Sequence, residues 1–479
     1  MLIGSQLTTT TQTHPNQASI RVAPVVTALS SALDLSTGQP PGHSIRACII
    51  GMRIGQEIGL SADALNDLFY ALLLKDCGCS ANSSKTFHAL GSDDLKAKRD
   101  VKTTDWTRTS WETIQYALGH VATGKPFVER VRNLLRMAAT QKVHARDVTK
   151  IRCERGATLC RLMGLTEATA NAVLNLDEHW DGHGYPEGHS REEIPILSRI
   201  MLLAQTLEVF LIAYGPEAAL TAVHNRRGTW FDPGLLDAVT SLATRNALWT
   251  DTSGENLSEI CLRMEPDPRA LEADETTLDN IALAFSGIVD AKSPFTYNHS
   301  LGVANAAIAT ARALGLSRER IVFLRHAALL HDLGKLGVSN AILEKPAKLD
   351  NGEWEVMKQH PRDTWKILQA VPGFEEMSNV AGSHHEKLDG SGYFRGVTGD
   401  QLSVEARILA VADIFDALAA NRPYREGLPL EKVFQIIRAE APHKLDAGCV
   451  EALEQSGAES SQIFLDLENM RHALLPVED

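Results

Sequence analysis

The C-terminal half of the chain holds histidine and aspartate side chains of the kinds that bind transition metals. Imidazole nitrogens and carboxylate oxygens are preferred donors for iron, manganese, zinc and nickel. An aspartate between two histidine-bound ions can bridge them through its two oxygens. Such a dinuclear site can hold a phosphoryl group and produce hydroxide at neutral pH. A single histidine on a helix is more often a hydrogen-bonded polar group than a ligand, so only the whole set is informative. The set consists of His299, His331, Asp332, His360, His384, His385 and Asp413.

The segments around these residues show helical periodicity. Residues 63–74, 320–330 and 405–418 place apolar side chains at positions i, i+3, i+4 and i+7, whereas the alternation typical of strands is scarce. At 479 residues the chain also exceeds what one hydrophobic core usually serves. We therefore predict an all-α protein with at least two domains.

Two stretches of the chain carry the same anchor residues at the same spacing. The pair Lys75-Asp76 lies 32 positions after His43, and the pair His331-Asp332 lies 32 positions after His299. Further along each stretch, a glycine-rich segment begins with an aspartate, and an Arg-Ile dipeptide lies 18 positions after that aspartate. The two segments are 181–186 and 389–394. Agreement at several separated anchors indicates a tandem repeat of one helical domain.

Composition indicates where the two repeats begin and end. Two prolines and several acidic residues separate them, as in a linker, and a run of threonines near the N-terminus is typical of a mobile tail. We expect a disordered tail over 1–20, a degenerate first domain over 21–264, a linker over 265–276 and a second domain with the full ligand set over 277–479.

The first repeat is longer than the second and carries an insertion near residues 80–150. Its polar segment Ser80–Asp105 is rich in serine, lysine and aspartate. We expect this segment to be a surface loop rather than a contact with a partner.

The ordered motifs of the second repeat resemble the HD-GYP branch of the HD-domain phosphohydrolases, over about residues 278–454. The resemblance implies an all-helical fold, two or three metal ions and hydrolysis of a cyclic dinucleotide, and it makes this half the catalytic domain. The matching motifs are Asn298-His299-Ser300, His331-Asp332-Leu333-Gly334-Lys335, His360-Pro361, His384-His385-Glu386-Lys387-Leu388-Asp389-Gly390-Ser391-Gly392-Tyr393, Arg407-Ile408, Val411-Ala412-Asp413-Ile414-Phe415-Asp416-Ala417 and Asn421-Arg422-Pro423-Tyr424-Arg425.

The same resemblance implies that all seven histidines and aspartates listed above are metal ligands, with Asp332 bridging. Asp332 and Lys335 would be the catalytic residues, and Lys335 would contact the scissile phosphate from one turn beyond His331 if the helix persists. Family members with three metals have a glutamate where this chain has Phe295, which cannot bind a metal. We therefore expect two divalent ions, iron or manganese first, with nickel, zinc or magnesium as alternatives.

The resemblance also implies residues that hold the substrate. Arg422 and Arg425 would bind its phosphate or guanine, tasks that suit a guanidinium group, and Tyr393 would contact it from the glycine-rich loop. Asp389 and Asp416 would orient ligands or the loop without binding metal.

The glycine-rich loop of the second repeat departs from the family's pattern at one position. Where the family signature ends in Gly-Tyr-Pro, this loop has Gly392-Tyr393-Phe394. The departure puts the geometry of the loop, and any protein contacts made through it, in doubt.

The first repeat has lost most of the ligands. A cation or an alkyl group cannot replace a neutral imidazole at a metal, so we predict that this repeat is catalytically silent and packs against the second. By spacing, Lys75 stands at the position of His331, Arg152 at His360, Leu176 and Asp177 at His384 and His385, and Gln205 at Asp413, while His43 and Asp76 are retained.

Composition limits partners and compartment. A net charge of −13 argues against polymeric nucleic acid as a partner, and seven cysteines suit a reducing cytoplasm. The apolar stretch Ile200–Tyr214 contains Gln205 and Glu208, so we expect a buried helix and no membrane insertion. A homodimer is compatible with the sequence.

The predicted substrate is a cyclic dinucleotide, with cyclic di-GMP ahead of 3′,3′-cyclic GMP-AMP. Two alternatives remain open at this point: another HD-type phosphohydrolase acting on a nucleotide, and a non-catalytic sensor of the dinucleotide. The expected product is the linear dinucleotide or GMP.

Overall fold

The computed structural model describes residues 20–104, 111–123, 126–254, 256–266, 272–421 and 426–457. Within these ranges the chain is helical, and the all-α prediction is confirmed. One short sheet pairs β1 (Ile20–Arg21) with β2 (Glu272–Ala273) in antiparallel register, Ile20 opposite Ala273. The predicted tail, residue 20 excepted, lies outside the described residues.

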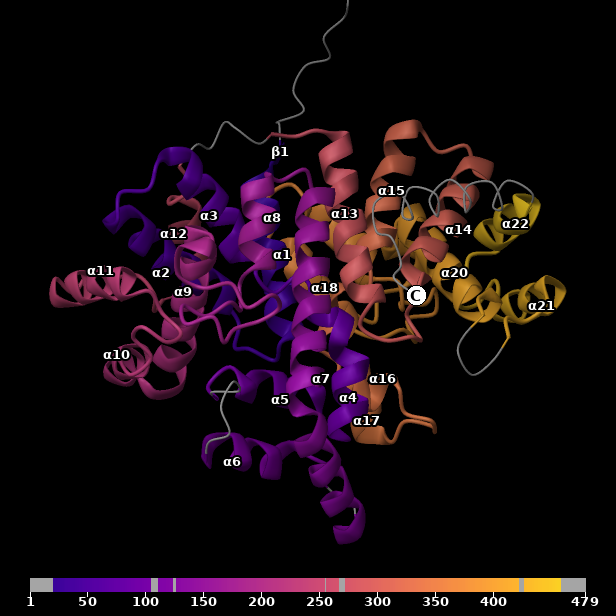
Figure 1. Cartoon of the computed structure of the whole chain (residues 1–479). Helices are drawn as coiled ribbons and strands as arrows, with labels where there is room; N and C mark the ends of the chain where they lie inside the picture. The colour runs from indigo at the N-terminus through magenta and orange to yellow at the C-terminus, as the bar shows by residue number, and fades with distance from the viewer. Residues whose placement is uncertain are drawn as a thin grey trace, which may run out of the picture.

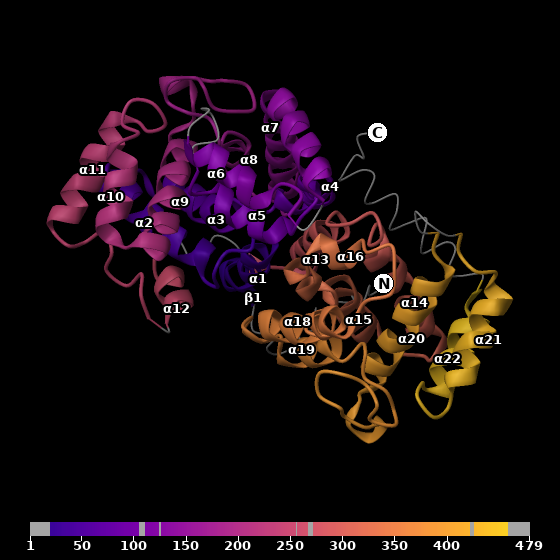
Figure 2. The ribbon, with the colours of Figure 1, turned by 90° about the horizontal axis from the view of Figure 1, so that it is seen from below.

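The first repeat occupies one side of the molecule and the second repeat the other (Figures 1 and 2). The elements of the first repeat are α1 (Val22–Ser36), α2 (His43–Glu57), α3 (Ala62–Leu74), η1 (Cys79–Asn82), α4 (Ser83–Leu90), α5 (Asp94–Val101), α6 (Trp111–His120), α7 (Phe127–Leu162), α8 (Glu167–Leu174), η2 (Arg191–Glu193), α9 (Ile196–Tyr214), α10 (Pro216–His224), α11 (Pro233–Thr244) and α12 (Leu257–Leu262). Those of the second repeat are α13 (Glu275–Asp290), α14 (His299–Ala313), α15 (Arg318–Leu330), η3 (Leu333–Gly337), α16 (Asn340–Leu343), α17 (Asn351–Met357), α18 (His360–Gln369), α19 (Glu375–Gly382), η4 (Gly399–Gln401), α20 (Val404–Ala419), α21 (Leu430–Glu440) and α22 (Ala447–Gln455).

Equivalent helices of the two repeats begin in the same way. Both α2 and α14 start at a histidine that follows a left-handed residue, Gly42 with φ 84° and Asn298 with φ 60°, which glycine and asparagine tolerate best. A buried aspartate then accepts a 2.7 Å hydrogen bond from the hydroxyl of the next serine, in the pairs Asp34–Ser44 and Asp290–Ser300. These bonds place the first histidine of each repeat.

A close backbone approach supports the alignment of Arg152 with His360. A Cβ atom added to Gly334 would lie 2.1 Å from the carbonyl oxygen of His360. One added to Gly78, the equivalent glycine, would lie 1.9 Å from the carbonyl oxygen of Arg152. Both positions therefore require glycine, because real Cβ atoms do not approach so closely. The alignment deduced from spacing agrees with this packing.

The two repeats contact each other through equivalent elements. Helix α1 packs against η3 and α18 of the second repeat, and α13 packs against η1 and α7 of the first. Most positions of α1 are buried around its whole circumference, as expected for a helix enclosed by protein on all sides. A single hydrophobic core runs through both repeats.

The insertion differs from the expected loop, because the polar segment forms α4 and α5. The side chain of Asp93 caps α5 by accepting hydrogen bonds from the backbone N–H groups of Leu95 and Lys96, at 3.0 and 3.4 Å. Leu90, Ala97, Val121 and Ala122 form a small core of their own beneath these helices. The many charged residues concealed this sparse apolar pattern.

Helix α9 is long and apolar enough to cross a membrane by length and composition alone. In the fold, 67% of its most apolar window is buried, and it packs against α2, α3, α8 and α10. It is a core helix of the first repeat.

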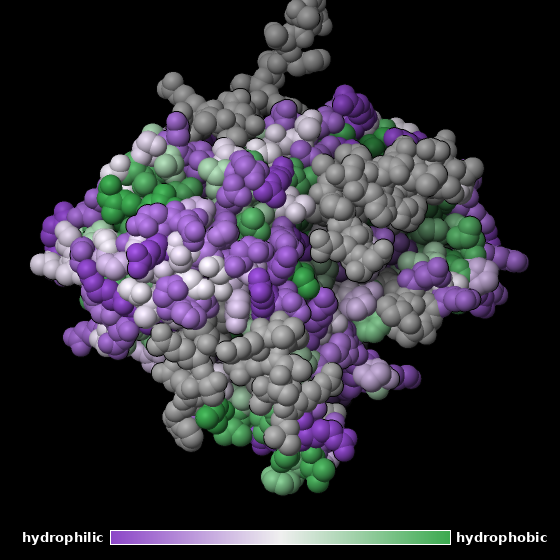
Figure 3. Space-filling view, viewed as in Figure 1, coloured by the Kyte–Doolittle hydropathy of each residue, from purple (hydrophilic) through white to green (hydrophobic). Residues whose placement is uncertain are grey.

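The surface in Figure 3 is mostly polar, and apolar side chains gather at the lower tip, where α6 and the start of α7 lie. Phe127 and Val128 are 80% and 71% exposed there.

Candidate metal centre

Helix ends bring most of the predicted ligands together. His299 and His360 are the first residues of α14 and α18, His331 and Asp332 follow the end of α15, and the His384–His385 pair follows α19. Asp413 lies in the middle of α20. All except His385 are buried, and the side chain of His385 is 24% exposed.

One group of ligand atoms gathers around one oxygen of Asp332. The Nε2 atoms of His299 and His331 lie 3.5 and 3.4 Å from Asp332 Oδ2. His299 Nε2 also lies 3.2 Å from Asp413 Oδ1. Atoms that share an ion at about 2.0–2.2 Å stand roughly 3.0–3.5 Å apart, so these separations suit one metal ion.

A second group gathers around the other oxygen of Asp332. The Nε2 atoms of His360 and His384 lie 3.5 and 3.7 Å from Asp332 Oδ1, and His385 Nδ1 lies 3.7 Å from Asp413 Oδ2. Each aspartate thus turns one oxygen to each group. Asp332 thus lies between two groups of potential metal ligands.

Hydrogen bonds at the far ring nitrogens orient the histidines. Nδ1 of His331, His360 and His384 each donates to the backbone carbonyl three residues earlier, at 2.7 Å. Because a carbonyl oxygen only accepts, the proton is on Nδ1 and the Nε2 lone pair faces the centre. His299 Nδ1 contacts Asp416 Oδ2 at 2.7 Å instead, a carboxylate–histidine pair of the kind that supports metal ligands.

Burial keeps three of these imidazoles neutral. It lowers the pKa of His331, and it lowers the pKa of His360 to about 3 and of His384 to about 4. Burial opposes ionisation of Asp332, but the ammonium group of Lys335, in contact with that carboxylate, offsets this effect and helps to hold its pKa well below the usual range. Neutral imidazoles and ionised carboxylates are the forms that bind metal.

Two observations indicate that the centre is built for cations. His331 Nε2 and Asp332 Oδ1 are buried, and neither atom has a hydrogen-bond partner among the described residues. The Nε2 atoms of His360 and His384 lie 3.1 Å apart with both lone pairs facing inward. Buried polar atoms left in this way cost free energy, which bound metal ions would remove.

Lys335 lies beside the centre, but it is not on the same α-helix as His331. Helix α15 ends at Leu330, and Lys335 lies in the 3-10 helix η3, so no continuous α-helix joins it to His331. Its Nζ atom lies 2.5 Å from Asp332 Oδ2.

Tyr393 lies beside the centre, with its ring centroid 4.7 Å from that of His385. Arg422 and Arg425 lie outside the described residues.

A buried glutamate that we did not predict shapes the glycine-rich loop. Glu386 accepts hydrogen bonds from the backbone N–H groups of Arg395 and Gly396, at 2.7 and 3.3 Å. Glu178 accepts equivalent bonds from Glu187 and Gly188 in the first repeat. The signal was present in the sequence, because both glutamates stand three residues before the loop aspartate.

Asp389 and Phe394 also belong to the glycine-rich loop. Asp389 is exposed and accepts hydrogen bonds from the backbone and hydroxyl of Ser391, at 2.9 and 2.6 Å, within the loop itself. Phe394, which stands where the family has proline, adopts a φ of 95°. A positive φ strains the backbone of a residue other than glycine by about 1–3 kcal/mol. The loop therefore accommodates phenylalanine in place of proline at a local cost in free energy.

In the first repeat a lysine takes the place of the first ligand group. The Nζ atom of Lys102 lies 3.2 Å from His43 Nε2, 2.9 Å from Asp76 Oδ1 and 3.1 Å from Gln205 Oε1. We call these four residues the vestigial centre. Lys102 follows α5 in the insertion and has no counterpart in the second repeat, so the repeat pattern could not identify it. Its ammonium group supplies the positive charge of a metal ion but cannot activate water.

The second ligand group is also replaced. Arg152, at the position of His360, forms an ion pair with Asp177, at the position of His385. Lys75, at the position of His331, pairs with Asp76. Cationic side chains thus occupy both halves of the site.

The comparisons with known proteins agree with this geometry. A family model described as HD domain matches residues 129–235 and 284–448. The chain is 41% identical over 440 residues to the 3′3′-cGAMP-specific phosphodiesterase 3 of Vibrio cholerae, covering 92% of this chain and 95% of that protein. A crystal structure of a V. cholerae cyclic GMP-AMP-specific phosphodiesterase matches with a TM-score of 0.65 and 37% identity, over 92% of this chain and 98% of that one. A cyclic di-GMP phosphodiesterase of Thermotoga maritima is 34% identical over 171 residues, covering 35% of this chain and 46% of that protein.

Proposed function

The chain belongs to the HD-domain family and is a cyclic-dinucleotide phosphodiesterase, and we propose that its second repeat hydrolyses 3′,3′-cyclic GMP-AMP. The observation that supports this substrate is a match over 92% of the chain, including both repeats, to a relative named as specific for it. Cyclic di-GMP, which we ranked first from the sequence, is the second candidate. It is favoured by a relative named for cyclic di-GMP that matches about a third of the chain.

We propose that the seven clustered histidines and aspartates hold two divalent ions, iron or manganese first. Such ions would supply hydroxide and stabilise charge on the phosphoryl group. Phe295 precedes α14 and offers no ligand atom for a third ion. Asp332 turns one oxygen to each ligand group and so fixes their spacing.

We propose roles for the residues at the rim of the centre. The ammonium of Lys335, 17% exposed and beside Asp332, can contact a phosphate oxygen that reaches the two ligand groups. Tyr393 can cover one side of the substrate from the glycine-rich loop. Arg422 and Arg425 follow α20 and would bind phosphate or guanine there.

The first repeat is proposed to be catalytically silent and to support the second through packing. Lys75, Lys102 and Arg152 place fixed positive charges where metal ions would bind, and these charges repel divalent cations. Helix α1 meanwhile packs on η3, the element that carries Lys335.

The decisive experiment measures hydrolysis of both dinucleotides by the purified, metal-loaded full chain. We expect a higher kcat/KM for 3′,3′-cyclic GMP-AMP than for cyclic di-GMP, and the reverse ratio would overturn the substrate assignment. Asp332→Ala should reduce turnover of both by several orders of magnitude. The control Asp237→Ala changes an exposed aspartate of the first repeat and should leave turnover unchanged. Wild-type turnover in Asp332→Ala would contradict the dinuclear centre.

A further inference from the structure

A cavity lies at the vestigial centre of the first repeat, next to a wide cleft. The cavity has a volume of about 270 Å³, and Lys102, Arg152 and Gln205 line it. It shares the lining residues Thr104 and Tyr116 with a cleft of about 1280 Å³ between α5–α6 and α9–α10. Known ligand sites measure roughly 300–1,000 Å³, so the cleft by itself is large enough for a dinucleotide.

We propose that the first repeat binds a cyclic dinucleotide in this cleft without cleaving it. The substrate class rests on the function proposed for the second repeat. The cavity stands at the position that corresponds to the catalytic centre, since Gln205 aligns with Asp413 and Arg152 with His360. A duplicated domain thus keeps an open space at this position while its metal ligands are gone.

The lining carries N–H donors of the kind that bind phosphate. Among the described residues that line the cavity and the cleft, the cationic side chains are Arg99, Arg226, Lys98, Lys102 and Arg152, and the carboxylates are Asp100 and Asp177. Four of these cations are already paired with carboxylates: Lys98 with Asp94, Lys102 with Asp76, Arg99 with Asp100 and Arg152 with Asp177. The lining therefore offers guanidinium and ammonium donors rather than a large net charge. Guanidinium and ammonium groups are the usual partners of phosphate.

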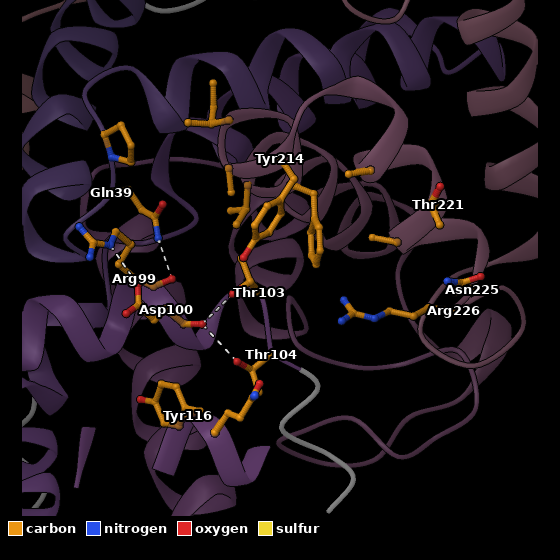
Figure 4. Close-up of a pocket in the computed structure, with 18 of the residues that line it drawn as sticks. Gln39, Arg99, Asp100, Thr103, Thr104, Tyr116, Tyr214, Thr221, Asn225 and Arg226 are labelled. Carbon is orange, nitrogen blue, oxygen red and sulfur yellow. Dashed lines mark hydrogen bonds and ion pairs between the residues drawn. The ribbon is translucent and has the colours of Figure 1, made fainter. Parts of the chain in front are cut away.

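The cleft also offers flat surfaces on which bases could stack. Tyr214 is 64% exposed, and its ring extends into the cleft in Figure 4. The guanidinium group of Arg226 lies 4.3 Å from the ring centroid of Trp230 and reaches toward the middle of the same view. Aromatic rings and guanidinium planes are the common stacking partners of nucleobases.

The vestigial centre explains why binding would not lead to cleavage. The ammonium of Lys102 lies among His43, Asp76 and Gln205, where the second repeat has its first ligand group. Cys79 stands at the position of Lys335 and contacts Asp76 Oδ1 at 3.5 Å. The site therefore retains ammonium and guanidinium donors, but it has no means of generating hydroxide.

The test uses the full chain carrying Asp332→Ala, so that no probe is hydrolysed. Binding of 3′,3′-cyclic GMP-AMP, and of cyclic di-GMP in a parallel arm, is measured by equilibrium dialysis as affinity and sites per chain. Adding Thr221→Glu places a negative charge on the exposed, cleft-lining face of α10. Thr244→Glu on α11 is the matched control, because both hydroxyls are exposed and donate to the carbonyl four residues earlier at 2.8 Å.

In the Asp332→Ala chain, we expect Thr221→Glu to raise the dissociation constant of one dinucleotide site at least tenfold. Thr244→Glu should leave that dissociation constant unchanged. Tyr214→Ala should weaken the same site, because it removes a stacking surface. Absence of saturable binding in the Asp332→Ala chain, or equal affinity and site number with and without Thr221→Glu, would overturn the proposal. Failure of the wild-type chain to hydrolyse either dinucleotide would instead contradict the proposed function of the second repeat.

Discussion

Asp94 connects the insertion of the first repeat to the catalytic half, and we predict that Asp94→Ala destabilises the protein and slows catalysis. Asp94 is fully buried at the start of α5. Its Oδ1 atom accepts hydrogen bonds from the backbone N–H of Asn340 at 2.8 Å and from the hydroxyl of Ser339 at 3.1 Å. Its Oδ2 atom lies 3.5 Å from Lys98 Nζ. One carboxylate thus caps α16 of the second repeat and neutralises a lysine of the first.

The expected magnitude follows from these contacts. Alanine would leave the Lys98 ammonium, whose side chain is 13% exposed, without its carboxylate. Breaking such a buried pair by removing one partner costs about 3–5 kcal/mol, and the N–H of Asn340 would lose its acceptor as well. Helix α16 directly follows η3, so we also expect a reduced kcat through displacement of Lys335.

The assay is urea unfolding followed by circular dichroism, together with kcat for the proposed substrate. The matched control is Asp350→Ala, because Asp350 also caps a helix, α17, but its side chain is 67% exposed. Loss of an exposed cap costs about 1 kcal/mol. A free energy of unfolding for Asp94→Ala within 1 kcal/mol of wild type, with unchanged kcat, would refute the link between the repeats.

Three further predictions follow from the structure. Elemental analysis should find two metal ions per chain, and chelation should abolish hydrolysis and lower the melting temperature; three tightly bound ions would show that another residue replaces Phe295 as a ligand. Burial lowers the pKa of Lys292 to about 7, so the folded state binds fewer protons than the unfolded state between about pH 7 and 10.5. The free energy of unfolding of the wild type should therefore rise by roughly 1.4 kcal/mol per pH unit relative to that of Lys292→Met as pH increases through this window. If urea unfolding gives the same pH dependence of the free energy of unfolding for both proteins, the assignment is contradicted. Residues from Ala273 to the end, expressed alone, should be less stable and less active because α1 no longer covers η3 and α18; equal melting temperature and turnover would show that the first repeat has another role.

The fold class and the candidate ligand residues could be predicted because both depend on local patterns. Helical periodicity persists wherever one face of a helix is buried, and histidine and aspartate carry their donor atoms in any context. The repeat was visible because the same helices must place equivalent residues at the same spacing. The structure brings the seven predicted residues together in two adjoining groups, with six of them buried and His385 partly exposed.

Several features could not be predicted from spacing. The segment Ser80–Asp105 contains α4 and α5 because Asp93 caps a helix whose few apolar residues find a small separate core. Lys335 leaves the face of His331 because α15 ends at Leu330. In each case tertiary contacts or a helix end outweighed the local pattern.

The sequence by itself determined which donor atoms are available and which repeat had lost them. Only the tertiary structure decided that Asp332 turns one oxygen to each ligand group, and that Lys102 enters the vestigial centre. Residue types establish the chemistry of a side chain at its own position. The direction of a carboxylate oxygen, or the arrival of a lysine from an insertion, depends on how helices far apart in the chain pack against one another, and no periodicity encodes that.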